Sequence, residues 1–208
     1  MNQKNSLGLN ICFQDLKNPI QLFENWMNEA IKSEPNDPNA FTLATSDKNG
    51  NSSARVVLLK NFNESGFVFY TNYNSQKSTI LKNNPFASMC FHWKSLLRQI
   101  RISGSVSSVS NEEADIYFKT RSYDSRIGAW ASKQSKILNT REELFSEIEK
   151  YKKKYPKNDN VPRPKHWSGW RLSPIEIEFW LDGSNRIHER LKYIKKKDEN
   201  WERILLNP

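Results

Sequence analysis

Arg55-Val-Val-Leu-Leu-Lys60 is the stretch of sequence that decides the fold. After the turn-like Asn63-Glu-Ser-Gly66 come Phe67-Val-Phe-Tyr-Thr-Asn72 and then Ser75-Gln-Lys77. Two runs of β-branched and aromatic residues around a turn predict a hairpin of two strands. Such a hairpin would place cations, hydroxyls and an amide beside an apolar sheet, which suits a phosphate attached to a flat ring. The same stretch also fits a surface hairpin with solvated Lys and Arg side chains.

Composition favours one ordered domain. The chain has 208 residues, 12% of them aromatic, and seven are Trp. This length can bury a core, and this aromatic content argues against disorder. The two cysteines, Cys12 and Cys90, have no metal-ligand spacing and suggest no disulfide framework. With no apolar segment of signal-peptide or membrane-span character, we expect a cytoplasmic protein.

The formal net charge of +9 is compatible with nucleic acid, an anionic membrane surface or anionic small ligands. Much of the lysine excess lies in two tracts, 150–157 and 192–197, which are typical of solvated faces. The arginines are instead scattered singly among hydroxyls and aromatics. This distribution favours recognition of an anion at a few points.

Periodicity predicts an α+β protein that is mainly β. We expect strands at 41–46, 55–60, 67–72, 86–93, 98–108, 166–172, 175–180, 186–190 and 201–206, and helices at 19–33, 77–84, 110–120 and 140–155. Short connections between the early strands favour an antiparallel sheet that closes toward a barrel. Residues 1–18 have no clear period and predict a mobile segment before a single domain at 19–208. The stretches 122–135 and 156–165 are expected to be loops.

The alternation Arg186-Ile-His-Glu-Arg190 would put three basic groups on one face of a strand. Such groups repel one another unless an anion or solvent faces them. A solvated edge strand explains the pattern equally well. An anion site needs further donors, and the sequence offers Lys60, Tyr117, Arg121 and Ser125.

Motifs for other chemistries are absent from the sequence. There is no glycine-rich dinucleotide or P-loop signature, no nucleophile elbow and no cluster with metal-ligand spacing, so we predict no metal. A phosphate here would therefore be held by arginine and hydroxyl side chains.

Several motifs together resemble the pyridoxine (pyridoxamine) 5′-phosphate oxidase family, over about residues 19–208. In chain order they are Arg55-Val-Val-Leu-Leu-Lys60, Phe69-Tyr-Thr-Asn72, Arg98-Gln99, Tyr117 with Arg121 and Ser125, Ile127-Gly-Ala-Trp130, Ser132-Lys-Gln-Ser135, Glu178-Phe-Trp180 and Arg186-Ile-His-Glu-Arg190. The resemblance implies a split β-barrel with flanking helices, a homodimer, and FMN in clefts between the subunits. It also implies oxidation of pyridoxine or pyridoxamine 5′-phosphate to pyridoxal 5′-phosphate, with dioxygen as acceptor and peroxide as product, and with ammonia released from the amine.

The resemblance also assigns roles to residues of this chain. The FMN-binding set is Arg55, Val56, Val57, Leu58, Leu59, Lys60, Tyr70, Thr71, Gln76, Lys77, Gln99, Gln134, Ser135, Trp180 and Arg190. Gln99 is expected to reach across the dimer. The substrate phosphate is assigned to Lys60, Tyr117, Arg121 and Ser125, and the pyridine end and the catalytic role to Arg186 and His188.

The chain departs from the family pattern at two places. The family usually has Arg beside the lysine of the FMN-phosphate motif, where this chain has Gln76, so one charge-assisted contact is lost. An Arg and Tyr pair that often closes over the substrate is missing from residues 1–18. Weaker FMN binding and different lid contacts are the expected consequences.

Three other functions remain open from the sequence. Another split-barrel flavin reductase would keep the flavin site but not the phosphate donors. A basic nucleic-acid-binding barrel would use the aromatics and lysine tracts and would bind single strands in a salt-dependent way. A carrier of pyridoxal phosphate would bind the product without consuming oxygen. The family resemblance instead predicts no nucleic acid and no membrane as partners.

Overall fold

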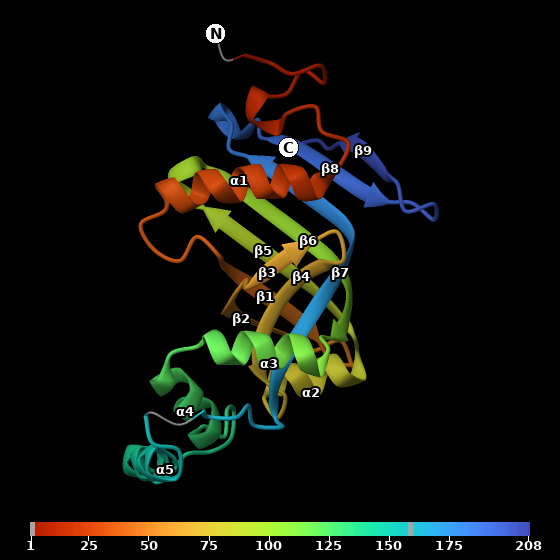
Figure 1. Cartoon of the computed structure of the whole chain (residues 1–208). Helices are drawn as coiled ribbons and strands as arrows, with labels where there is room; N and C mark the ends of the chain where they lie inside the picture. Colours follow the sequence, from red (N-terminus) through yellow and green to blue (C-terminus); the bar gives the residue numbers. More distant parts are fainter. Residues whose placement is uncertain (1–2, 158–159) are drawn as a thin grey trace.

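The structure is a computed structural model that describes residues 3–157 and 160–208. Nine strands of the described residues form one antiparallel sheet in the order β2-β1-β5-β6-β7-β4-β3, with β8 on β7 and β9 on β8 (Figure 1). The strands are β1 (Ala40–Ser46), β2 (Ser52–Leu58), β3 (Asn61–Asn63), β4 (Gly66–Asn72), β5 (Phe86–Trp93), β6 (Arg98–Ser108), β7 (Trp167–Leu181), β8 (Glu189–Lys195) and β9 (Trp201–Leu205). The helices are α1 (Pro19–Ser33), α2 (Gln76–Asn83), α3 (Asn111–Thr120), α4 (Tyr123–Ala131) and α5 (Arg141–Lys154), with short 3-10 turns at Ile11–Phe13, Lys94–Leu96 and Ser184–Arg186. The predicted antiparallel, mainly β fold with flanking helices is confirmed.

Helix α1 covers one face of the curled sheet (Figure 1). It begins as predicted, because the Asn18 side chain accepts from the Ile20 amide and Pro19 occupies the first turn, where no amide donor is needed. Phe23, on its buried face, meets Phe67 edge-on at a centroid distance of 4.9 Å. Trp26, fully buried, meets Phe179 in the same way at 5.2 Å. These contacts fix the helix to both ends of the core.

Strand β7 is a single strand where the sequence predicted two. It pairs with β6 from residue 170 to residue 181, and the register shift at Ser103/Gly104 accommodates Pro174. The other edge of β7 is shared, because β4 pairs with residues 167–172 and β8 pairs with residues 176–181. Since β4 and β8 pair with different halves of the same strand, the sheet splits into two wings.

The predicted hairpin between residues 55–60 and 67–72 is wrong. Strand β2 pairs with β1, and Arg55 lies opposite Leu43. The Asp47–Gly50 turn closes that hairpin, because the Asp47 carboxylate accepts from the Asn49 and Asn51 amides. Strand β4 instead pairs with the three-residue β3 and with β7. Leu59 and Lys60 lie after the end of β2, in the link between β2 and β3.

The expected loop at 122–135 contains helix α4. The hydroxyl of Ser122 accepts from the Ser125 amide and so provides an N-terminal cap. The hydroxyl, amide and cationic residues of this stretch are typical of a loop, but they also occur on the exposed face of a capped helix. The expected loop at 156–165 has no helix or strand in its described residues, and residues 158–159 lie outside them.

The predicted strand at 186–190 is also wrong. Asn185 and Arg186 have left-handed backbone angles, with φ of 59° and 65°, and strand β8 begins only at Glu189. A left-handed backbone cannot continue the alternation of a strand. Arg186, His188 and Arg190 therefore do not share one strand face.

The N-terminal segment, for which we predicted mobility, packs on the core in its described part, residues 3–18. Phe13 is fully buried, and the Cys12 carbonyl accepts from the Trp26 indole at 2.7 Å. Both cysteines are free and half-buried, and burial raises the pKa of each thiol, that of Cys12 to about 11. Residues 1–2 lie outside the described residues. No helix in the described chain has the length and apolar character needed to cross a membrane.

We expect Gly104→Ala to destabilise the protein by about 2 kcal/mol or more, because overpacking costs this much where nothing can move aside. A Cβ at Gly104 would lie 2.0 Å from the Ser173 carbonyl oxygen, at the point where β6 and β7 shift register. The control is Gly128→Ala in α4, where a Cβ meets nothing within 4 Å. Urea unfolding should show the control equal to or more stable than the wild type, since alanine favours a helix. Equal stability of the Gly104→Ala variant would contradict the described β6–β7 register.

Candidate active site

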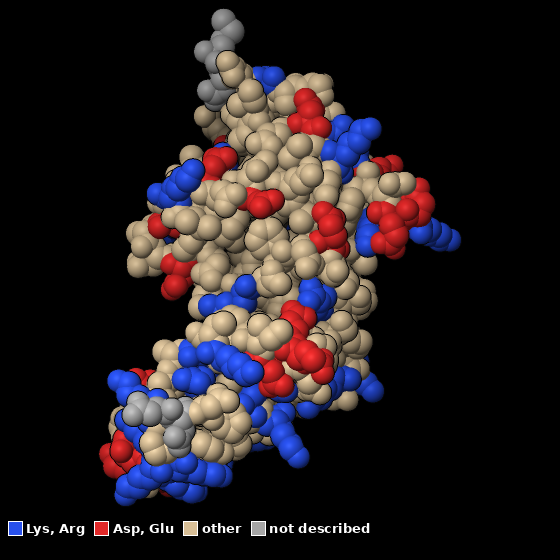
Figure 2. Space-filling model, in the orientation of Figure 1, with Lys and Arg blue, Asp and Glu red and all other residues tan. Residues whose placement is uncertain are grey.

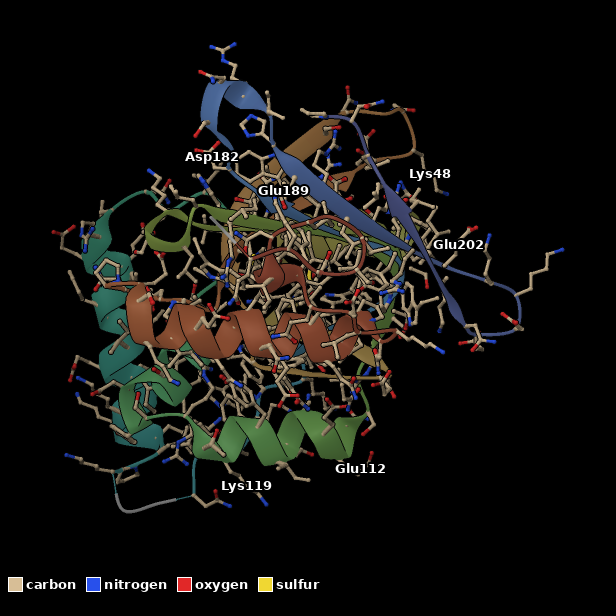
Figure 3. All side chains as sticks on the ribbon, turned by 90° about the horizontal axis from the view of Figure 1, so that it is seen from above. Lys48, Glu112, Lys119, Asp182, Glu189 and Glu202 are labelled. Carbon is tan, nitrogen blue, oxygen red and sulfur yellow. The ribbon has the colours of Figure 1, made fainter. Side chains whose placement is uncertain are left out.

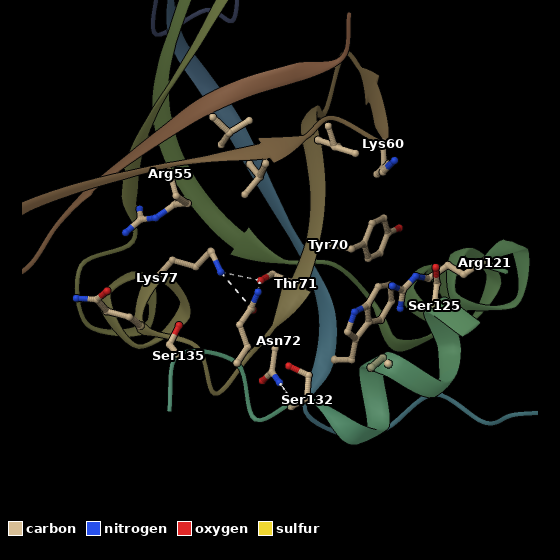
Figure 4. Close-up of a pocket in the computed structure, with 18 of the residues that line it drawn as sticks. Arg55, Lys60, Tyr70, Thr71, Asn72, Lys77, Arg121, Ser125, Ser132 and Ser135 are labelled. Carbon is tan, nitrogen blue, oxygen red and sulfur yellow. Dashed lines mark hydrogen bonds between the residues drawn. The ribbon is translucent and has the colours of Figure 1, made fainter. Parts of the chain in front are cut away.

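A cavity of about 740 Å³ lies where β2, β4 and helix α4 meet (Figure 4). Its wall consists of Ser53, Ala54, Arg55, Val56, Val57, Leu58, Lys60, Tyr70, Thr71, Asn72, Gln76, Lys77, Tyr117, Arg121, Ser125, Gly128, Ala129, Ser132, Gln134, Ser135 and Trp167. Four of these residues are Lys or Arg, and none of the described lining residues is Asp or Glu. A cavity with cations and no carboxylate suits an anionic ligand.

Lys77 is the most buried cation of the cavity. Its ammonium lies 3.1 Å from the Thr71 hydroxyl, 3.2 Å from the Ser75 hydroxyl and 3.3 Å from the Gln134 side-chain oxygen, all neutral acceptors. Burial and the nearby Arg55 charge lower the pKa of Lys77 to about 8. An anion bound here would restore the charge balance that the protein itself does not supply.

Arg55 is held in the same region by neutral oxygens. Its guanidinium donates to the Thr45 hydroxyl at 2.7 Å and to the Ser53 hydroxyl at 2.6 Å, and burial lowers its pKa. The Ser135 side chain lies across the cavity from it, in the turn after α4 (Figure 4). Arg55, Lys77 and Ser135 thus supply two charges and a hydroxyl to one end of the cavity, which fits a phosphate.

Lys60, Arg121 and Ser125 lie at the other end (Figure 4). Tyr117 also lines the cavity and stacks on Tyr70. Arg121 ends helix α3, and Ser125 lies in the first turn of α4. Burial raises the pKa of Tyr117, which therefore stays a neutral donor near pH 7. Burial lowers the pKa of Arg121, but the ordinary value of an arginine lies so far above neutral that the side chain is still cationic. This end fits a second phosphate.

An apolar and aromatic wall joins the two ends. Val56, Val57 and Leu58 line it on one side, and Tyr70 stacks on Tyr117 with ring centroids 4.1 Å apart. Burial raises the pKa of Tyr70 to about 12. Leu59, which we placed in the cofactor set, points away and packs in the hydrophobic core.

Besides Leu59, five of the predicted site residues do not line this cavity: Gln99, Trp180, Arg186, His188 and Arg190. Three of them are cross-strand neighbours, because Gln99 pairs with Trp180 and Trp180 pairs with Arg190. The start of β8 lies at the opposite end of the molecule from α4 (Figure 1). One chain thus carries the predicted residues as two separate clusters.

His188 and Arg186 belong to the second cluster. The imidazole of His188 lies over Trp180 with centroids 4.6 Å apart, and its Nδ1 is 2.9 Å from the Asp182 carboxylate. Arg186 is exposed on the turn before β8. Asp182, which the sequence did not single out, lies on the loop that projects from the sheet (Figure 3).

The sequence missed several lining residues. Asn72 donates to the Ser132 carbonyl at 3.2 Å and so ties β4 to the end of α4. Both residues lie inside motifs that carried the resemblance, so a signal for them existed. Trp167 had no such signal, because the sequence predicts only a strand there, at 166–172, and Trp167 lies in none of the family motifs.

The protein is an antiparallel split barrel, and its cavity is lined by cations and hydroxyls. These features define it as a β protein that binds an anionic small ligand. The family comparison is more specific. Residues 27–166 match the pyridoxamine 5′-phosphate oxidase family, and residues 167–208 match the C-terminal dimerisation region of pyridoxine 5′-phosphate oxidase. The chain belongs to the pyridoxamine 5′-phosphate oxidase family, and it carries that family's dimerisation region.

Relatives and solved structures agree with this membership. A pyridoxine/pyridoxamine 5′-phosphate oxidase of Pelagibacter ubique is 67% identical over 208 residues, all of both chains. One of Allorhizobium ampelinum is 49% identical over 197 residues, 94% of this chain and 95% of the relative. PhzG from Burkholderia lata, solved with tetrahydrophenazine-1-carboxylic acid, is 30% identical with a TM-score of 0.88, over 95% of this chain and 96% of that one. An FMN-binding protein of Nostoc punctiforme shares the fold, with a TM-score of 0.74 at 15% identity, over 92% of this chain and 98% of that one.

We expect Lys77→Met to stabilise the ligand-free protein by about 1–2 kcal/mol, because it removes a buried, uncompensated charge. The pKa of Lys77 is lower in the folded chain, about 8 against 10.5, so the unfolded chain binds more protons between these values. The wild type therefore gains stability as pH rises from 8 to 10.5, and its deficit relative to the variant shrinks.

The measurement is urea unfolding of the ligand-free protein across that pH range. Lys82→Met, an exposed lysine on the same helix, is the control and should differ from the wild type by less than about 0.5 kcal/mol at every pH. A Lys77→Met variant whose stability difference does not change between pH 8 and 10.5 would contradict the described environment of Lys77.

Proposed function

We propose that the protein is an FMN-dependent oxidase that converts pyridoxine or pyridoxamine 5′-phosphate to pyridoxal 5′-phosphate. Dioxygen is the acceptor, peroxide is the product, and the amine substrate also releases ammonia. The observation that carries this proposal is a single cavity with cations and hydroxyls at both ends, joined by an apolar wall and free of carboxylates among its described residues. The names of the relatives support the same activity.

The residues at the Lys77 end fit the phosphate of FMN. Arg55 and Lys77 supply the charge, and Ser135 supplies a hydroxyl. Thr71, Gln76 and Gln134 add polar groups, and the strand 56–58 with Tyr70 supplies the wall for the ring system. Bound by these residues, FMN would supply the two-electron chemistry between the substrate and dioxygen.

The other end fits the phosphate of the substrate. Lys60 and Arg121 match the charge of a dianion, and Tyr117 and Ser125 donate hydrogen bonds to its oxygens. Binding the phosphate there leaves the substrate ring over the same apolar wall. The protein thus fixes the distance and orientation of the reacting rings, which is a large part of its contribution to the rate.

The second cluster completes the site from a second copy of the chain. Trp180, Arg186, His188 and Arg190 all lie within the dimerisation region, residues 167–208, and Gln99 is registered against Trp180. A two-fold dimer brings the opposite ends of two chains together twice. Gln99, Trp180 and Arg190 of one copy would then help to hold the flavin bound by the other, and Arg186 with His188 would contact the substrate ring.

Arg186 and His188 act on the pyridine end of the substrate. The substrate must lose a hydride from its exocyclic carbon and a proton from its hydroxyl or amine. His188, held by Asp182 and by the face of Trp180, is a fixed acceptor or donor of hydrogen bonds. Arg190 is the cation at the flavin edge, where negative charge develops on reduction.

The first test is the absorption spectrum of the purified protein, followed by pyridoxine 5′-phosphate without oxygen. We expect a yellow protein that bleaches with the substrate and recovers its colour in air. A yellow protein that does not bleach would indicate a different flavin reductase. A protein that gains no colour with added FMN would exclude the flavin, and binding of single-stranded nucleic acid would then be measured.

We expect Arg186→Ala to lower kcat by about 100-fold or more while FMN stays bound, because Arg186 contacts the substrate ring and not the cofactor. Steady-state kinetics and the FMN content of the purified variant measure the two effects. Loss of FMN with normal turnover after reconstitution would refute the assignment.

Mixing variants tests whether the site is shared between copies. Arg121→Ala damages the part of the site that the cavity supplies, and Arg186→Ala damages the part that the partner copy supplies. Neither variant homodimer therefore has an intact site. After the subunits exchange, about a quarter of all sites should be complete, because each mixed dimer has one intact site. Absence of recovered activity in verified mixed dimers would place both residues in one chain's site.

A further inference from the structure

Arg121 is a partly buried arginine that no carboxylate of the described residues holds. Its Nη1 is enclosed away from solvent and has no hydrogen-bond partner within the described residues. Several other arginines pair with carboxylates, as Arg163 does with Asp115 at 2.6 Å. No described carboxylate lines the cavity where Arg121 lies. Something other than an ion pair must therefore keep the guanidinium in place.

Aromatic faces provide that support. The guanidinium carbon of Arg121 lies 4.6 Å from the ring centroid of Trp167 and 5.6 Å from that of Phe118. Both distances are within the range of a cation–π contact, and a tryptophan ring is the strongest of the aromatic acceptors. Figure 4 shows Arg121 beside Ser125, and both line the cavity.

Trp167 is itself held rigidly. Its side chain is 6% exposed, and its ring lies parallel to that of Tyr70, with centroids 5.3 Å apart and an interplanar angle of 6°. Its backbone carbonyl accepts from the Arg163 guanidinium at 2.8 Å, and its backbone pairs with β4 opposite Asn72. A ring fixed by the start of β7 gives the flexible Arg121 side chain a fixed surface to lie on.

We propose that Trp167 is a positioning residue for the substrate phosphate and acts through Arg121. A carboxylate would hold the guanidinium equally well but would neutralise the charge that the phosphate needs. An aromatic face holds it and leaves its charge and its remaining N–H donors for the ligand. This inference rests on the proposed function, in which Arg121 binds the phosphate of the vitamer.

Kinetics of variants at Trp167 separate this role from simple packing. We expect Trp167→Leu to raise the KM for pyridoxine 5′-phosphate roughly tenfold, with kcat of the FMN-saturated enzyme nearly unchanged. Trp167→Phe keeps a weaker aromatic face, so its KM should rise roughly threefold. An unchanged KM in a folded Trp167→Phe variant, or a fall in kcat without a rise in KM, would overturn the proposal.

A double-mutant cycle tests whether the effect of Trp167 on KM depends on Arg121. In an Arg121→Ala background, replacing Trp167 by Leu or Phe should no longer change KM, because there is no guanidinium left to position. A packing role predicts the same fold-change in both backgrounds, and that result would overturn the proposal. If Trp167→Leu does not fold, the Phe cycle alone decides the question.

Inorganic phosphate provides a readout that does not need turnover. We expect it to shift the Nε–H resonance of Arg121 in the wild-type holoenzyme, with an affinity that is weaker in Trp167→Phe. Wild-type protein that binds phosphate at Arg121 but does not oxidise the vitamers would refute the proposed function alone. Equal phosphate affinity in the wild type and in Trp167→Phe would refute the role of Trp167 alone.

Discussion

The architecture depends on one strand that serves two partners along a single edge. β7 is hydrogen-bonded to β6 over most of its length, while its opposite edge pairs with β4 in one half and with β8 in the other. Because β4 and β8 follow one another along that edge, the sheet branches into two wings, one on each half of β7. One wing supports the cavity, and the other presents Trp180, His188 and Arg190. The separation of the two clusters is thus a direct result of how the backbone hydrogen bonds of β7 are divided.

The second constraint is electrostatic. Arg55, Lys77 and Arg121 are all partly or largely buried, yet their described partners are hydroxyls, carbonyls and aromatic rings rather than carboxylates. Burying charge in this way lowers the stability of the ligand-free fold. The same arrangement leaves each cation available for an incoming phosphate. Ligand affinity and intrinsic stability are therefore opposed within the same few side chains.

Much of the fold could be predicted from the sequence, because helix caps, turn residues and hydrophobic period are local signals. The helix at 19–33 is an example, because its start and its end are both present as predicted. The pairing partner of β2 and the left-handed turn at Asn185 and Arg186 were not predictable, since strand pairing and strained backbone depend on contacts far along the chain. The family motifs in the sequence identified most of the site residues. Only the three-dimensional structure shows that these residues form two clusters at opposite ends of the molecule.

The proposed reaction has a consequence for the two free cysteines, Cys12 and Cys90. Each turnover with dioxygen would release peroxide, and peroxide attacks thiolates far faster than thiols. Burial raises the pKa of both Cys12 and Cys90, so near neutral pH almost none of either is ionised. Under the proposed function, the fold would thereby protect both thiols from the peroxide, and oxidative damage over many turnovers should fall on side chains other than these two.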